Sequence, residues 1–153
     1  MVDEILVFTD GGCQGNPGPG GWAFVLLDGG RELSFSGGEK FTTNNKMELT
    51  AAIEALKMIS QNDDWKGRKV NVFSDSQYVK NGITSWIKKW KANGWKTAAK
   101  KDVLNKELWV QLDAYFLSLN VEWNWVKGHA GIKYNEMCDQ LCAKEMAKFT
   151  GKI

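Results

Sequence analysis

A nearly continuous apolar run close to the N-terminus is the feature that most constrains the fold. It covers residues 4–10 and reads Glu-Ile-Leu-Val-Phe-Thr-Asp. A strand with apolar side chains at consecutive positions is typical of the centre of a sheet that is covered on both faces. The glycine-rich stretch 11–21 that follows predicts a loop, so we expect this central strand to end at Asp10.

Periodicity predicts the other elements and their order along the chain. A turn signal at 28–30 joins two strands in a hairpin, and Gly82 is expected to break the chain after a short helix. The predicted strands lie at 4–10, 22–27, 32–37, 69–74 and 121–126, and the predicted helices at 44–60, 76–79, 104–117 and 134–149. This alternation predicts an α/β fold in which hairpin-paired and parallel strands share one sheet with helices on its faces.

The composition is that of an ordinary globular protein. Hydrophobic residues make up 43% of the chain and charged residues 25%, which excludes the disordered and fibrous classes. No stretch approaches the roughly 18 apolar residues that span a bilayer, and the first residues lack the basic flank of a signal peptide. We therefore expect residues 1–153 to form one domain of a cytoplasmic protein that binds no membrane.

The cysteine count supports a reducing compartment. Cys13, Cys138 and Cys142 are an odd number of thiols, which argues against a disulfide framework. Together with His129, the one histidine, they could form a closed Cys3His zinc site. The spacing of Cys138 and Cys142 is not that of a tight zinc knuckle, so we disfavour this alternative.

Four acidic residues lie near the ends of predicted elements. They are Asp10, Glu48, Asp75 and Asp139. Ligands of such sheets bind beyond the carboxyl ends of the central strands, and a small-residue helix face at 51–55 would let Glu48 approach that edge. Crowded carboxylates repel one another unless a cation lies between them, so we predict a site for Mg²⁺, or for Mn²⁺ as its substitute.

Two such ions about 4 Å apart can activate a water and stabilise the leaving oxygen of a phosphodiester. The group therefore predicts hydrolysis without a covalent enzyme intermediate. His129, between two glycines of a loop, could relay a proton near the metals or could have no chemical role.

Each carboxylate also has a purely structural explanation. Asp10 and Asp75 could be turn residues that end strands. Glu48 follows Asn45 by three residues, which is the spacing of a capping residue. Asp139 could lie near the positive end of its helix, where acidic side chains are stabilising.

Positive charge is concentrated in residues 86–106, which we call the handle. This segment holds seven lysines and one aspartate, which gives it a local charge of +6. Because the net charge of the whole chain is +2, the rest of the chain carries −4. Trp86, Trp90 and Trp95 are interleaved with these lysines. Tryptophans four apart on a helix often pack into a core, and this alternative fits Trp86 best. The lysine excess favours nucleic-acid binding that weakens as salt rises.

Side-chain amides gather near the predicted strand ends. They belong to Asn16, Asn44, Asn45 and Gln77. An amide can hydrogen-bond a 2′-hydroxyl and the base edges of a shallow minor groove. Ordinary turn and capping duty is the alternative, and both roles can coexist at Asn44 and Asn45.

Five sequence blocks together resemble the type 1 ribonucleases H in their bacterial form. The blocks run in order across nearly the whole chain, at 8–21, 43–49, 74–79, 94–97 and 126–139. The quoted residues include Phe8-Thr9-Asp10-Gly11, Thr43-Asn44-Asn45, Ser74-Asp75-Ser76-Gln77 and Lys127-Gly128-His129-Ala130-Gly131.

The resemblance implies a ribonuclease H-like fold with a five-stranded mixed sheet. It implies a monomeric endonuclease that cuts the RNA strand of an RNA/DNA hybrid and leaves 5′-phosphate and 3′-hydroxyl ends. The implied metal-binding catalytic residues are Asp10, Glu48, Asp75 and Asp139, with His129 as a mobile assistant. The implied groove contacts are Asn16, Asn44, Asn45 and Gln77, and the implied DNA-strand contacts are Thr43, Trp86, Trp90 and Asn105.

Two other functions are compatible with parts of the pattern. A non-catalytic binder of hybrids or double-stranded RNA would keep the fold and the handle, but the intact set of four carboxylates disfavours it. A nuclease domain associated with a polymerase or an integrase is disfavoured because the chain reads as self-contained.

One position departs from the family pattern. Members often carry an arginine two residues before the position of Thr43, where it grips a DNA phosphate, and Phe41 stands there in this chain. Lys40 could substitute, so we expect a weaker or differently built phosphate pocket.

Phe41→Arg should raise the affinity for an RNA/DNA hybrid and steepen its salt dependence by about one unit. Titrations at several salt concentrations measure both, and no gain in either would contradict the hypothesis.

Overall fold

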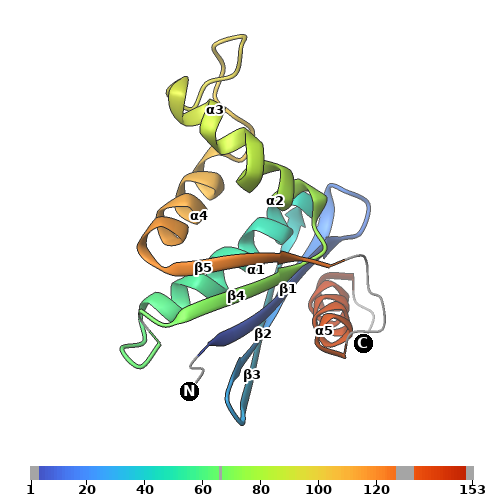
Figure 1. The fold of residues 1–153 in the computed structure, drawn as a ribbon. Coiled ribbons are helices and arrows are strands. Elements are labelled where there is room, and N and C mark those ends of the chain that lie inside the picture. The colour runs from blue at the N-terminus through green and yellow to red at the C-terminus, as the bar shows by residue number, and fades with distance from the viewer. Residues whose placement is uncertain (1–3, 66, 127–132, 151–153) are drawn as a thin grey trace.

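Five strands form one mixed sheet in the order β3-β2-β1-β4-β5 in the computed structural model (Figure 1). The structure describes residues 4–65, 67–126 and 133–150 of the 153-residue chain. The antiparallel strands are β1 (Ile5–Cys13), β2 (Gly18–Asp28) and β3 (Arg31–Thr42), and the strands added in parallel to β1 are β4 (Lys69–Ser74) and β5 (Asn120–Trp125). The expected five-stranded mixed sheet is confirmed.

The central strand β1 continues past its predicted end. Residues 11–13 pair with residues 20–22 of β2. The glycines of these segments make room for the helices that cover the sheet, since a Cβ at Gly11 would meet the backbone of Met47 and one at Gly21 would meet the oxygen of Cys142. The predicted loop is therefore shorter than its glycine content indicated, and β2 begins at Gly18. Asp10 lies inside β1 rather than at its end, which corrects the placement made from sequence.

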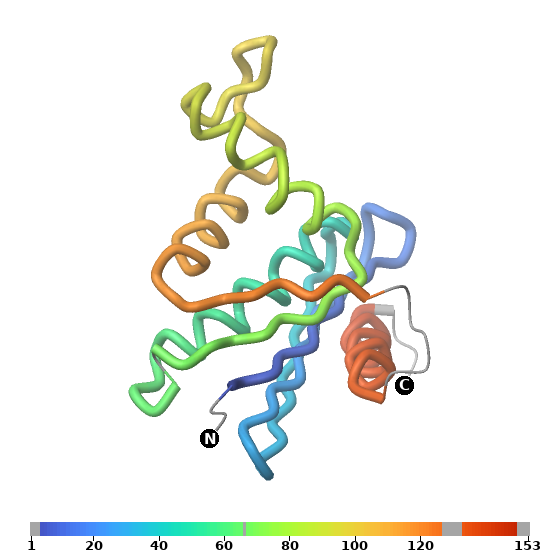
Figure 2. The backbone as a smooth tube through the Cα atoms, in the orientation of Figure 1, coloured from blue at the N-terminus to red at the C-terminus, as the bar shows by residue number. Residues whose placement is uncertain are grey.

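Helices cover both faces of the sheet (Figures 1 and 2). α1 (Asn44–Ser60) and α4 (Lys106–Ser118) pack on one face, and α5 (Lys133–Thr150) packs across β1, β2 and β3 on the other. The apolar side chains that α1 buries include Leu49, Ala52, Ile53, Leu56 and Ile59, as the helical spacing predicted. Within the described ranges, no helix is both long and apolar enough to cross a bilayer.

Hydroxyl side chains begin two of the helices. Thr43 Oγ1 accepts the backbone N–H of Lys46 at 3.2 Å at the start of α1. Ser76 Oγ accepts the N–H of Val79 at 3.1 Å at the start of α2 (Gln77–Asn81). Such caps satisfy N–H groups that have no partner within the helix. The cap at Ser76 starts α2 directly after Asp75.

The helical path does not break at Gly82, which corrects the expectation from sequence. α2 continues through a π-helical turn, η1 (Gly82–Trp86), into α3 (Ile87–Ala92). A Cβ at Gly82 would lie 2.0 Å from the Trp109 ring, so this glycine permits a close contact with α4 instead of ending a helix. α3 and the loop after it project from the body of the protein, at the top of Figure 1.

Gly11 permits the closest approach between β1 and α1. A Cβ at Gly11 would lie 2.3 Å from the carbonyl carbon of Met47 and 2.5 Å from the nitrogen of Glu48. Both neighbours are backbone atoms, so no side-chain rotation can relieve the overlap. We expect Gly11→Ala to lower the free energy of unfolding by about 2–3 kcal/mol, as measured by denaturant unfolding.

Gly12 offers a matched control in the same strand. A Cβ there would have Met146 Cε as its nearest neighbour, at 3.6 Å, which is an ordinary contact. Gly12→Ala should therefore change the free energy of unfolding by less than about 1 kcal/mol. Equal losses in the two variants would show that the close approach at Gly11 is not the source of the effect.

Candidate functional site

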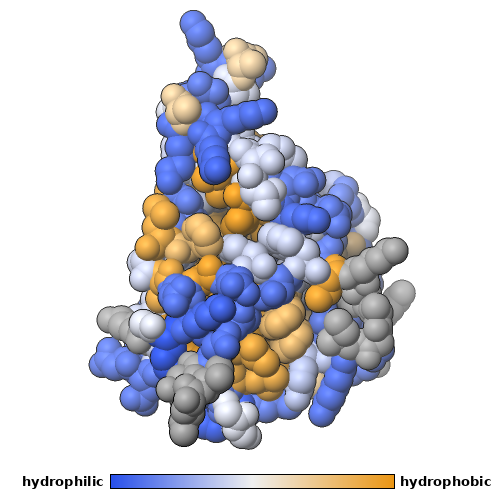
Figure 3. All heavy atoms as spheres, in the orientation of Figure 1, coloured by the Kyte–Doolittle hydropathy of each residue, from blue (hydrophilic) through white to orange (hydrophobic). Residues whose placement is uncertain are grey.

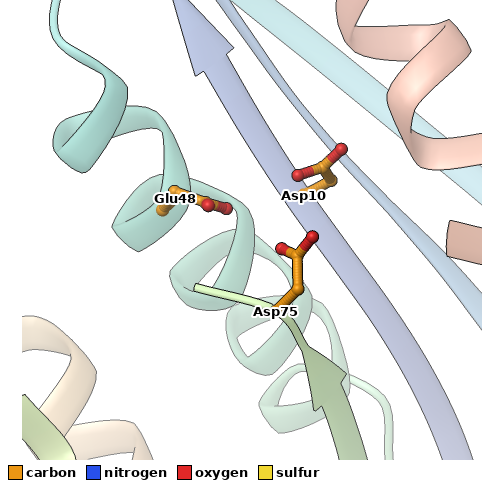
Figure 4. Close-up of side chains that lie close together, drawn as sticks. All are labelled: Asp10, Glu48 and Asp75. Atoms are coloured by element: carbon orange, nitrogen blue, oxygen red, sulfur yellow. The ribbon is translucent and has the colours of Figure 1, made fainter. Parts of the chain in front are cut away.

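Three carboxylates from separate elements meet at one end of the sheet (Figure 4). Asp10 belongs to β1, Glu48 to α1, and Asp75 follows β4; one oxygen of each lies within 4.8 Å of the others. The parallel register of β1 and β4 pairs Phe8 with Phe73, and this register brings Asp10 and Asp75 together two residues later. The convergence expected from the sequence is therefore present for these three side chains.

Burial makes this convergence costly for ionised carboxylates. Asp10 is 6% exposed and Glu48 is 8% exposed. Burial raises the pKa of Glu48 well above its usual range, and the charges of Asp10 and Asp75 raise it further. A cation between the oxygens would remove the repulsion, and a donor set made only of oxygen suits a hard divalent ion.

Asp139 lines the same cavity from α5. The cavity has a volume of about 460 Å³, and Asp139 lines it together with Asp10, Glu48 and Asp75. Asp139 is exposed and does not belong to the group of three within 4.8 Å. The structure thus brings the fourth predicted residue to the site without placing it in the tight cluster.

The structural explanations fail for three of the four carboxylates, whereas Asp75 does directly follow a strand, as its structural alternative expected. The N-cap of α1 is Thr43, so Glu48 is not the partner residue of a capping box. Asp10 pairs within a strand and is not a turn residue. Asp139 lies more than one turn beyond the start of α5 at Lys133, where the favourable effect of the helix terminus has faded.

The cysteines belong to the core and to the rim of the cavity. Cys138 and Cys142 are buried, and their thiols donate to the backbone oxygens of Phe8 and Asp10 at 3.3 and 3.5 Å. Burial raises the pKa of the Cys138 thiol to about 12. Among the described residues, the carboxylates gather as possible metal ligands and no cysteine joins them. The structure gives the Cys3His alternative no support, although His129 lies outside the described residues.

Two of the four predicted amide contacts line the carboxylate cavity. Asn44 and Gln77 line the cavity itself. Asn16 Oδ1 accepts the backbone N–H of Asn44 at 2.8 Å, so the loop after β1 is tied to the first turn of α1. The capping alternative therefore applies to Asn16, while Asn45 stays partly exposed on the same turn.

A second cavity, of about 610 Å³, lies on the other side of the first two turns of α1. It is lined by Lys46 and Thr50 of α1 and by Asn105 and Lys106 at the start of α4. Asn44 and Glu48 occupy one side of the helix, and Lys46 and Thr50 lie about 200° around it, since each residue advances by about 100°. Lys46 and Thr50 were not predicted from the sequence. Each lies two residues after a predicted site residue, Asn44 or Glu48, and this spacing would have indicated the other side of the helix.

An aromatic cluster supports the handle. The ring centroids of Trp86 and Trp90 are 5.7 Å apart, and those of Trp90 and the fully buried Trp109 are 5.5 Å apart. Trp86 and Trp90 are only partly buried, so core packing accounts for part of each side chain and leaves part of it exposed. On the face drawn in Figure 3, the projection at the top of the molecule carries mostly hydrophilic side chains.

Tyr78 connects the two cavities, and sequence reasoning did not single it out. Its hydroxyl accepts hydrogen bonds from Asn105 Nδ2 at 3.1 Å and from Trp109 Nε1 at 3.0 Å. Tyr78 directly follows Gln77, which lines the carboxylate cavity. The side chain of Asn105 is therefore tied to the helix that starts beside Asp75.

Known ribonucleases H are similar to this chain over nearly its whole length. The family described as RNase H matches residues 3–147. The ribonuclease H of Hydrogenovibrio crunogenus is 53% identical over 150 residues, which are 98% of this chain and 100% of that protein. The ribonuclease H of Francisella philomiragia is 49% identical over 150 residues, which are 98% of this chain and 95% of that protein.

Two solved structures show the same likeness in three dimensions. LC9-RNase H1, a type 1 RNase H with the type 2 active-site motif, is 30% identical with a TM-score of 0.84, covering 97% of this chain and 74% of that chain. LC11-RNase H1 in complex with an RNA/DNA hybrid is 25% identical with a TM-score of 0.71, covering 94% of this chain and 97% of that chain.

The raised pKa of Glu48 predicts a pH-dependent cost to stability. In the unfolded chain Glu48 ionises near its ordinary value of 4.5, whereas in the folded protein it keeps its proton to higher pH. The metal-free protein should therefore lose stability as pH rises from that ordinary value through the raised folded value. Glu48→Gln should raise the free energy of unfolding at neutral pH by about 1–3 kcal/mol, because it removes a buried charge.

Urea unfolding in the presence of a chelator measures this difference. The gap between Glu48→Gln and the parent should shrink towards about pH 4, where Glu48 is largely protonated in both states. Glu54→Gln, on the same helix and outside the lining of either cavity, is the control and should show no such gap. A Glu48→Gln protein that is less stable than the parent at neutral pH would contradict the prediction.

Proposed function

This chain belongs to the ribonuclease H family as a type 1 member, and on that premise we propose that it hydrolyses the RNA strand of RNA/DNA hybrids. The cuts are internal and leave 5′-phosphate and 3′-hydroxyl ends. The observation that carries the proposal is the convergence of Asp10, Glu48 and Asp75 within 4.8 Å at the end of the central strands.

The residues that would hold divalent ions are Asp10, Glu48, Asp75 and Asp139. These residues suit a divalent ion because the crowding that raises the pKa of Glu48 would be relieved by a cation, and because all of their donor atoms are oxygens. When bound, Mg²⁺, or Mn²⁺ as a substitute, supplies an activated water and charge stabilisation at the leaving oxygen.

The chain itself presets the positions of these side chains. The N–H of Gly11 donates to Asp10 Oδ1 at 3.0 Å and limits the rotation of that carboxylate. Glu48 is fixed by the packing of α1 against β1, and Asp75 by the cap that begins α2. Asp139 lines the cavity from α5, and because its side chain is exposed it can adjust to its ligand. His129 assists proton transfer or product release in this proposal.

The two cavities beside α1 suit a double-stranded substrate. The RNA strand lies at the carboxylates, where Asn16, Asn44, Asn45 and Gln77 contact its groove and 2′-hydroxyls. The DNA strand follows the second cavity and the handle, where its contacts are Thr43, Asn105, Trp86 and Trp90. The hybrid-bound structure of LC11-RNase H1 supports this assignment of substrate class.

We also propose that residues 1–153 act as a single catalytic domain, and that the protein works as a monomer in the cytoplasm. The family match over residues 3–147 supports the first part. Size-exclusion chromatography with light scattering tests the monomer.

A labelled-hybrid assay tests the proposed activity. We expect Mg²⁺-dependent cleavage of the RNA strand that a chelator abolishes. Asp10→Asn should reduce kcat by about 10³-fold or more, a loss of about 4 kcal/mol in transition-state stabilisation. Asp63→Asn changes charge equally at an exposed position outside both cavities and should keep full activity.

Two outcomes would count against the proposal. Cleavage that persists in Asp10→Asn would remove that carboxylate from catalysis. Tight hybrid binding by the parent protein without any cleavage in Mg²⁺ or Mn²⁺ would favour a non-catalytic hybrid binder.

A further inference from the structure

Asp102 is the one acidic residue of the handle, and it lies between two of the handle's lysines. Its Oδ1 is 2.6 Å from Lys96 Nζ and 3.7 Å from Lys106 Nζ. All three side chains are substantially exposed, at 61% for Asp102, 47% for Lys96 and 38% for Lys106. One carboxylate therefore contacts two of the cations that the sequence assigns to nucleic-acid binding.

The backbone holds Asp102 in this position. Lys96 and Asp102 form an isolated antiparallel bridge, and the next residue, Val103, is 4% exposed and donates its N–H to the oxygen of Trp95 at 3.2 Å. The hydrogen bond from the Thr97 N–H to the Lys101 oxygen, at 2.7 Å, closes the turn above. The base of the loop is thus anchored to the core, and the contact with Lys96 is built into its register.

Asp102 faces the second cavity. It lines that space with Lys46, Asn105 and Lys106, on the side where the proposed function places the DNA strand. The hydrogen bond from Lys96 and the charge of Lys106 lower the pKa of Asp102. A permanent negative charge therefore lies beside cations that could otherwise bind phosphate.

We propose that Asp102 takes the place of a nucleic-acid phosphate between Lys96 and Lys106 and so limits the affinity of the handle for its substrate. The inference rests on the proposed function, because it assumes that the handle binds nucleic acid. Exposed ion pairs are weak, so an incoming phosphate can displace the carboxylate from the lysines. The displaced charge stays within a few ångströms of that phosphate and repels it.

The test is the binding of a labelled RNA/DNA hybrid in chelator by Asp102→Asn. The variant should bind about three- to tenfold more tightly at low salt, and its log-log salt slope should be steeper by about 1 unit because the handle then presents one more uncompensated positive charge to the phosphates. Double-stranded DNA of the same sequence should show a similar gain, since the effect is electrostatic. Adding Lys96→Met should reduce the gain that Asp102→Asn produces.

Glu122→Gln is the matched control. Glu122 lies on β5, outside the lining of either cavity, and forms an exposed ion pair with Lys69 at 3.3 Å. The substitution removes the same charge and breaks a similar pair, so hybrid affinity should change by less than about twofold.

Unchanged or weaker hybrid binding by Asp102→Asn would overturn the inference, and so would an equal gain in Glu122→Gln or a gain that Lys96→Met does not reduce. Hybrid cleavage by the parent protein in Mg²⁺ is scored separately. A parent that cleaves while Asp102→Asn gains no affinity refutes the inference alone. A parent that neither binds nor cleaves hybrid refutes the proposed function.

Discussion

The close approach of α1 to β1 at Gly11 is the contact on which the rest of the site depends. The helix backbone at Met47 and Glu48 occupies the space that any larger residue at position 11 would need. This contact sets the Glu48 carboxylate against Asp10, which β1 carries one residue earlier. The parallel pairing of β1 with β4 then delivers Asp75 to the same place. The α1–β1 contact and the β1–β4 pairing thus determine the geometry of all three carboxylates.

A site built in this way works against the stability of the protein that contains it. Three carboxylates within 4.8 Å, two of them buried, repel one another in the absence of a cation. The fold tolerates this cost because β1 and α1 also bury apolar side chains completely, among them Ile5, Val7 and Leu49. A metal ion that binds the folded state then adds its binding free energy to folding. The site and the fold are therefore coupled through charge.

Much of this arrangement could be predicted from the sequence, and the failures have identifiable causes. Helical spacing gave the bounds of α1 correctly, since local periodicity determines which residues it buries. Local signals misplaced the end of β1 and the break at Gly82. Gly11 and Gly82 permit contacts with Met47 and Trp109, which lie far from them in the sequence, so local patterns could not identify their role. The distance between Asp139 and the cluster depends on how α5 packs across the sheet, and no periodicity in the sequence encodes that.

In the proposed function, the position of α1 lets one small domain face two strands of nucleic acid. Its first two turns present Asn44 and Glu48 to one cavity and Lys46 and Thr50 to the other. The two spaces are separated by a single helix, about 10–12 Å across with its side chains. A-form duplexes have a wide, shallow minor groove with a backbone on each side. A helix of this width in the groove can contact both strands at once. Because Tyr78 ties Asn105 to the helix beside Asp75, the second cavity is fixed relative to the three carboxylates, which the proposed function assigns to the RNA strand. Selectivity for a hybrid then depends on whether a 2′-hydroxyl strand lies on the carboxylate side of α1.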